Sequence, residues 1–113
     1  MARVVAFIPD LLFGSNVLGA LQAAGHEVVL VGDTDALERA SSGVEVLVVD
    51  LTFDAANRIG LKRPQGVRTL GFYSHVEAEV REAAERAGFD LVVPRSRMAR
   101  EGAALVERLS AAG

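Results

Sequence analysis

Cysteine and tryptophan are both absent from the 113 residues of this chain, and proline occurs only three times. The absence of cysteine excludes disulfide bonds, thiolate zinc sites and thiol catalysis. No apolar run approaches the roughly 18 to 20 residues that a membrane-spanning helix requires. The first residues also lack the basic region and cleavage site of a signal peptide. We therefore expect a soluble, cytoplasmic protein that has no membrane partner.

The chain carries little net charge, because 12 basic residues stand against 15 acidic ones, which gives −3. This mild acidity argues against nucleic acid as a partner, since binding to phosphates needs a cationic surface. Hydrophobic residues make up 50% of the chain. A chain of this length and composition can bury a sizeable core without a metal to hold it together. We expect one domain that spans residues 1–113.

Short apolar runs rich in valine and leucine recur along the chain and predict strands. The runs are nearly continuous rather than alternating, which is typical of parallel strands that are covered by helices on both faces. The five predicted strands are Arg3–Ile8, Glu27–Val31, Glu45–Val49, Val67–Phe72 and Asp90–Val93.

Segments with helical spacing follow each predicted strand. Gly25 and Gly88 stand where the first and fourth of these helices would end in a left-handed residue, and Ser74 is expected to cap the start of the fourth. Five strand–helix units with right-handed crossovers predict an α/β fold, a single (βα)5 three-layer α/β/α sandwich. We expect a parallel five-stranded sheet in the flavodoxin-like order 2-1-3-4-5. The predicted helices are Leu12–Ala24, Thr34–Ala40, Phe53–Gly60, Val76–Ala87 and Arg97–Ala111.

Polar side chains follow four of the predicted strands, at the edge where this strand order places ligands and chemistry. Asp10 follows the first strand, and Asp50 follows the third. Ser74 and His75 follow the fourth strand, and Arg95 follows the fifth. These residues are the candidates for a site at the point where the strand order reverses. The two carboxylates have a purely structural alternative, because each could cap the turn or helix that follows it.

Three short stretches carry a resemblance to a known family, namely Val46–Asp50, Gly71–His75 and Ala84–Asp90. They resemble the matching segments of the response-regulator receiver domain, and the likeness extends from one end of the chain to the other. The resemblance implies a role in signal transduction. It also implies that Asp50 stands at the position of the residue that accepts a phosphoryl group, with Ser74 where the family keeps serine or threonine.

The chain departs from this family at residues that carry phosphoryl transfer. The family holds magnesium with an acidic pair after the first strand, whereas this chain has Pro9-Asp10. The family also places a lysine after the fifth strand, where this chain has Arg95; its only lysine, Lys62, precedes the fourth strand. Asp10 and Asp50 alone would bind Mg²⁺ weakly. We expect no other cofactor.

These departures favour a stand-alone atypical receiver, or pseudo-receiver, that regulates through protein–protein interaction without efficient aspartyl phosphorylation. A working phosphoacceptor at Asp50 is the alternative. Enzyme activity is not expected, because the sequence offers no paired acid and base and no activated nucleophile. Leu11, Leu12 and Phe13 cannot all face inward from one helical turn, which leaves apolar surface for a partner. The resemblance also allows a homodimer through the last two helices.

A second alternative is a small phosphate- or nucleotide-binding domain, with its site between the first and third strands. Gly14, Ser15 and Asn16 supply small side chains and amide groups near the start of the first helix, and Arg97 supplies positive charge. The chain lacks the glycine-rich motifs of nucleotide-binding loops, so the sequence predicts no nucleotide class.

Overall fold

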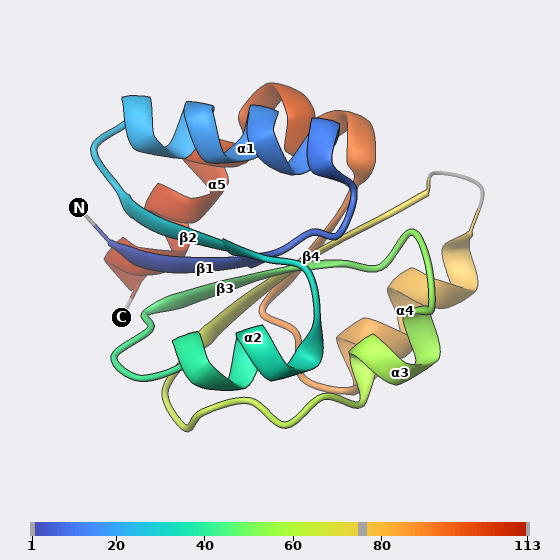
Figure 1. The fold of residues 1–113 in the computed structure, drawn as a ribbon. Coiled ribbons are helices and arrows are strands. Elements are labelled where there is room, and N and C mark those ends of the chain that lie inside the picture. Colours follow the sequence, from blue (N-terminus) through green and yellow to red (C-terminus); the bar gives the residue numbers. More distant parts are fainter. Residues whose placement is uncertain (1, 75–76, 113) are drawn as a thin grey trace.

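A sheet of five strands lies between two layers of helices (Figure 1). The computed structural model describes residues 2–74 and 77–112. None of the helices in these residues combines the length and the apolar character that a membrane span requires. In chain order the elements are β1 (Arg3–Phe7), α1 (Leu11–Ala23), β2 (Glu27–Val31), α2 (Thr34–Ala40), β3 (Val46–Asp50), α3 (Ala55–Ile59), β4 (Arg68–Tyr73), α4 (Ala78–Arg86), β5 (Leu91–Pro94) and α5 (Arg95–Ala112).

The strands are parallel and lie in the order β2-β1-β3-β4-β5, which confirms the predicted α/β sandwich and its topology. β3 is buried along its whole length, which explains why its sequence shows no alternation. The register pairs Val4 with Val46 and Asp50 with Phe72. The carboxyl ends of β1 and β3 are therefore neighbours, at the point where the strand order reverses.

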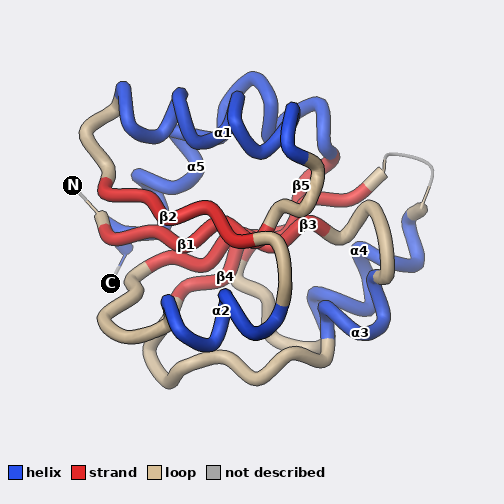
Figure 2. Tube along the Cα trace, in the orientation of Figure 1, coloured by secondary structure: helices blue, strands red, loops and turns tan. Residues whose placement is uncertain are grey.

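The two helical layers bury different sides of the sheet. Figure 2 shows α1 and α5 on one face of the strands and α2, α3 and α4 on the other. Val17, Leu21 and Met98 belong to the core on the α1–α5 side, whereas Leu37 and Ala84 belong to the core on the opposite side. The apolar residues of each helix recur at helical spacing because they lie on the face that packs against the sheet.

The helix ends follow the local sequence closely. Gly25 and Gly88 follow α1 and α4 with φ of 92° and 96°, left-handed values that glycine adopts without steric strain. Asp33 begins α2 by accepting a hydrogen bond of 2.7 Å from the amide of Ala36.

Four of the five predicted helix starts were wrong by one or two residues; α1 begins at Leu11 and α5 at Arg95. α3 begins at Ala55 rather than at residue 53, because the left-handed backbone of Asp54 cannot be part of a right-handed helix. α4 begins at Ala78, with Glu77 rather than Ser74 at the N-cap position and no capping bond from the Glu77 side chain. The backbone carbonyl of Ser74 instead accepts a hydrogen bond of 2.9 Å from the amide of Glu77.

His26 joins three segments at the edge of the sheet opposite the carboxyl ends of the strands. Its imidazole is buried, and Nδ1 accepts a hydrogen bond of 3.0 Å from the amide of Ala2. The ring proton is therefore on Nε2, which lies 3.3 Å from Oε2 of Glu107 on α5. One side chain just before β2 is consequently hydrogen-bonded to the residues that precede β1 and lies against the second half of α5.

Candidate functional site

Asp50 is the last residue of β3, and its side chain is buried beneath the loop that follows. Its Oδ1 accepts a hydrogen bond of 2.8 Å from the amide of Thr52 and another of 2.5 Å from the Thr52 hydroxyl. The carboxylate therefore closes the turn after the strand, as the structural alternative predicted. One of its two oxygens is already fully engaged by the protein itself.

Arg58 on α3 faces the other oxygen of this carboxylate. Its Nη1 donates a hydrogen bond of 2.8 Å to the backbone carbonyl of Asp50 and lies 4.0 Å from Asp50 Oδ2. The exposed fractions of the two side chains are only 10% and 6%. The guanidinium also lies over the Phe7 ring, 5.1 Å from its centroid. The buried acid thus has an internal cation as its neighbour.

A tight turn directs Arg58 back towards β3. Asp54 has φ of 55°, a left-handed value that aspartate tolerates better than most residues. Its Oδ1 accepts a hydrogen bond of 2.9 Å from Nδ2 of Asn57, and its carbonyl accepts one of 3.2 Å from the amide of Arg58. The helix that starts here places Arg58 one turn later, on the side that faces the end of the strand.

Asp10 is engaged by different partners. It caps α1 by accepting a hydrogen bond of 3.1 Å from the amide of Phe13. Its other oxygen lies 3.4 Å from Nη2 of Arg95, in a pair whose two side chains are each 48% exposed. Arg95 also stacks on the Phe13 ring, with 4.3 Å between the guanidinium carbon and the ring centroid. The two carboxylates at this edge are therefore each paired with a separate arginine.

A cavity of about 670 Å³ opens at the carboxyl edge of the sheet. It brings together Ser74 and Arg95, two of the residues that the sequence analysis placed here, but neither aspartate lines it. His75, the remaining candidate at this edge, lies outside the described residues. The lining residues are Phe13, Thr52, Ser74, Glu77, Arg95, Ser96 and Ala99.

The four residues proposed as an anion site point in different directions. Gly14 is buried against the sheet, where an added Cβ would lie 3.1 Å from Leu30, and its amide donates to the carbonyl of Asp10. Ser15 is exposed, and Asn16 lines a separate cavity between α1 and α5. Arg97 lies 3.4 Å from Glu101 along α5. The structure does not assemble these residues around a common point.

Arg58 was not among the residues predicted from the sequence to form the site. A signal for it was available, because Asp50 ends a buried strand and the chain lacks the lysine that could neutralise it from β5. A buried carboxylate needs a partner, and Arg58 belongs to the next helix along the chain. Whether the Arg58 side chain faces Asp50, however, depends on the left-handed conformation of Asp54, which sets the direction of the helix.

The fold is similar to that of response-regulator receiver domains, although no protein-family model and no curated protein match the chain. A response regulator from Thermotoga maritima is 13% identical over 98% of each chain, with a TM-score of 0.84. The non-phosphorylated HemR receiver domain from Leptospira biflexa is 15% identical over 97% of this chain and 94% of its own, with a TM-score of 0.80. An atypical orphan response regulator, whose structure revealed a phosphorylation-independent regulatory mechanism, is 15% identical over 96% and 94% of the two chains, with a TM-score of 0.74. These likenesses confirm the receiver-like fold that the sequence predicted.

Proposed function

We propose that this protein is a non-enzymatic regulatory domain with a receiver fold, which acts by binding another protein and is not efficiently phosphorylated on Asp50. The observation that carries this proposal is the pairing of Asp50 with Arg58. Phosphoryl transfer to an aspartate needs an accessible oxygen and a divalent cation that neutralises the incoming charge. Here Oδ1 is bound by Thr52, and Oδ2 faces a buried guanidinium.

The donor set at this edge does not fit a magnesium site. Mg²⁺ requires near-octahedral oxygen coordination and is usually held by one or two carboxylates with several waters. Asp10 caps a helix and pairs with Arg95, whereas Asp50 closes a turn and pairs with Arg58. The described residues contain no group of three or more acidic or histidine side chains that could hold a metal ion. The similar fold of an atypical orphan response regulator with a phosphorylation-independent mechanism supports the same interpretation.

Incubation with acetyl phosphate and magnesium is expected to leave Asp50 unmodified. Arg58 competes for the oxygen that would attack phosphorus, and no second acid beside Asp10 helps to bind the metal. The measurement is intact-protein mass spectrometry over time, with a phosphorylatable receiver domain treated in parallel and Asp50→Asn as the matched blank. An acylphosphate that forms on the wild type and disappears in Asp50→Asn would show that the domain is a working phosphoacceptor.

Exposed apolar side chains around the same edge support the interaction role. Leu11, Leu12 and Phe53 are 77%, 76% and 75% exposed, and we call these three residues the apolar rim. Leu11 and Leu12 begin α1, three residues after the end of β1. Phe53 follows β3, and its ring centroid lies 5.9 Å from the guanidinium of Arg58, which also stacks on β1. Large apolar side chains that are exposed near the carboxyl edge of the sheet are candidates for contact with a partner.

Replacing Leu12 and Phe53 together by serine is expected to weaken partner binding about tenfold or more, because apolar anchors dominate the energy of such interfaces. The measurement is quantitative capture of proteins from an extract of the cells that produce the chain. Val29→Ser is the matched control, since Val29 is an exposed apolar residue on β2. We expect the protein with both Leu12 and Phe53 replaced by serine to lose partners that the Val29→Ser and Asp50→Asn variants still capture. Equal capture by the rim variant would contradict this surface.

A further inference from the structure

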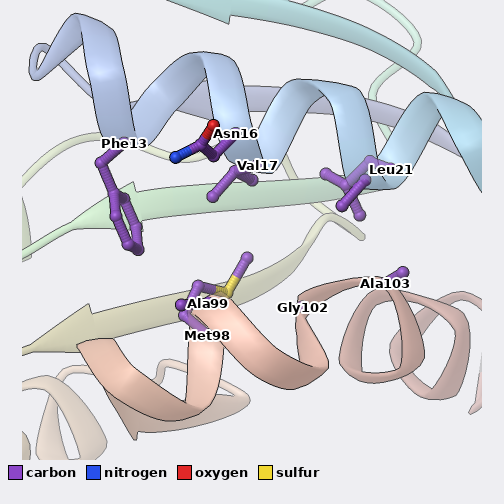
Figure 3. Close-up of a pocket in the computed structure, with 9 residues that line it drawn as sticks. Phe13, Asn16, Val17, Leu21, Met98, Ala99, Gly102 and Ala103 are labelled. Carbon is purple, nitrogen blue, oxygen red and sulfur yellow. The ribbon is translucent and has the colours of Figure 1, made fainter.

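A second cavity lies between α1 and α5, on the face of the sheet opposite α3 (Figure 3). Its volume is about 330 Å³. Figure 3 shows the Phe13, Val17 and Leu21 side chains pointing from α1 towards α5, with the Met98 side chain rising between the helices. The lining residues are Phe13, Asn16, Val17, Ala20, Leu21, Met98, Ala99, Gly102 and Ala103.

Small residues on α5 leave this space open. Ala99, Gly102 and Ala103 face large apolar side chains on α1 but do not fill the gap. Gly102 brings the backbone close to the thioether of Met98, because an added Cβ would lie 3.0 Å from Met98 Cε. Met98 is itself buried and unbranched, a side chain that adapts its shape to what it contacts. The cavity is therefore apolar, with an adaptable floor and with Asn16 as its polar lining residue.

One end of the apolar cavity adjoins the cavity at the carboxyl edge of the sheet. Phe13 and Ala99 line both cavities. Arg95 lies over the Phe13 ring and lines the edge cavity together with Ser74 and Ser96. The Arg95 guanidinium and the hydroxyl groups of Ser74 and Ser96 thus lie near the end of the apolar cavity. The present partner of the guanidinium, Asp10, is half exposed and 3.4 Å away, in a weak surface pair with which a ligand carboxylate could compete.

We propose that the space between α1 and α5 binds a small organic acid, with its apolar part against Phe13, Ala99 and Ala103 and its carboxylate at Arg95. The volume fits such a ligand, because an apolar cavity of about 150 Å³ is enough to hold benzene. It also lies at the lower end of the roughly 300 to 1,000 Å³ that is usual for small-molecule sites. The charge of Arg95 selects an acid over a neutral molecule. This inference does not depend on the proposed interaction role.

Octanoate and the neutral 1-octanol serve as probes, and binding is followed by amide shifts in ¹H–¹⁵N spectra of the whole protein. We expect octanoate to shift the amides of α1 and α5 that line the cavity. Ala103→Leu fills the cavity and is expected to weaken octanoate binding about tenfold or more. Ala104→Leu is the matched control, because Ala104 is an exposed neighbour on the same helix that does not line the cavity. It is expected to bind octanoate as the wild type does.

The role of the cation is tested separately. Arg95→Gln is expected to weaken octanoate binding about fivefold while leaving octanol unchanged, because it removes a charge-assisted hydrogen bond at a half-exposed position. Arg100→Gln, which removes an exposed arginine from the same helix, is expected to change neither. Equal binding of octanoate by the Ala103→Leu and Ala104→Leu variants would overturn the site. Equal affinity of the wild type for octanoate and octanol would overturn the proposed ligand class, and the absence of shifts with both probes would overturn the proposal as a whole.

Discussion

Replacing Arg58 by methionine is expected to lower the free energy of unfolding by about 3 kcal/mol, because it leaves the buried carboxylate of Asp50 without its cation. Methionine keeps an apolar side chain at this position but removes the guanidinium, so the loss reports the charge, its hydrogen bond and the contact of the guanidinium with the Phe7 ring. Arg58 also satisfies the backbone carbonyl of Asp50 at 2.8 Å, and that acceptor would lose its partner. The measurement is urea denaturation followed by circular dichroism.

Two further variants make this test specific. Arg81→Met removes an exposed arginine that pairs with Glu85 along α4, and it is expected to change stability by less than about 0.5 kcal/mol. Asp50→Asn combined with Arg58→Met is expected to cost less than the sum of the two single changes, because the neutral amide no longer needs a cation. If Arg58→Met does not fold, Arg58→Lys tests the same point, since it keeps the charge but loses the planar fork. An Arg58→Met variant as stable as Arg81→Met would contradict a structural role for this pair.

Gly71→Ala is expected to destabilise the protein by about 2 kcal/mol, the size of effect that overpacking of a core usually has. Gly71 is buried in β4, between the strand that carries Asp50 and β5. An added Cβ would lie 2.9 Å from Leu51 Cδ1 and 2.9 Å from Cδ2 of the Phe89 ring. Leu51 is buried and directly follows Asp50, so pushing it aside would also disturb the turn that Thr52 closes.

The matched control for Gly71→Ala is the same substitution at Gly19. Gly19 is exposed on α1, and an added Cβ would meet no atom within 4 Å. Alanine favours helix over glycine by about 1 kcal/mol in an exposed helix interior, so Gly19→Ala is expected to raise the stability. Both changes are measured by the same denaturation experiment. A Gly71→Ala variant that is as stable as the wild type would show that Leu51 and Phe89 can move apart without loss.

The fold was predictable because its determinants are local. The near-continuous apolar strands indicate a parallel sheet with both faces covered, and Gly25 and Gly88 mark the ends of two helices. α2 has the predicted bounds, Thr34–Ala40, because Asp33 caps it through its own side chain. Each of these features depends on residues that are neighbours in the sequence, and none requires the position of a distant side chain.

The candidate site was less predictable because its contacts join distant segments. Arg95 and Asp10 are 85 residues apart in the sequence, and Arg58 reaches Asp50 only because Asp54 is left-handed. The sequence placed Asp10, Asp50, Ser74 and Arg95 at one edge but could not show which carboxylate would meet which cation. It also showed that Leu11, Leu12 and Phe13 could not all face inward, but not that both leucines would be exposed.

The buried ring of His26 has a consequence for how the molecule opens in its native state. The ends of a domain usually fray independently, and their amide hydrogens exchange with solvent before those of the core. In this chain the amide of Ala2 is bound to the same imidazole that lies against Glu107 on α5. We therefore expect the amide of Ala2 and those of the second half of α5 to exchange in the same opening event, which hydrogen-exchange measurements on single amides would check.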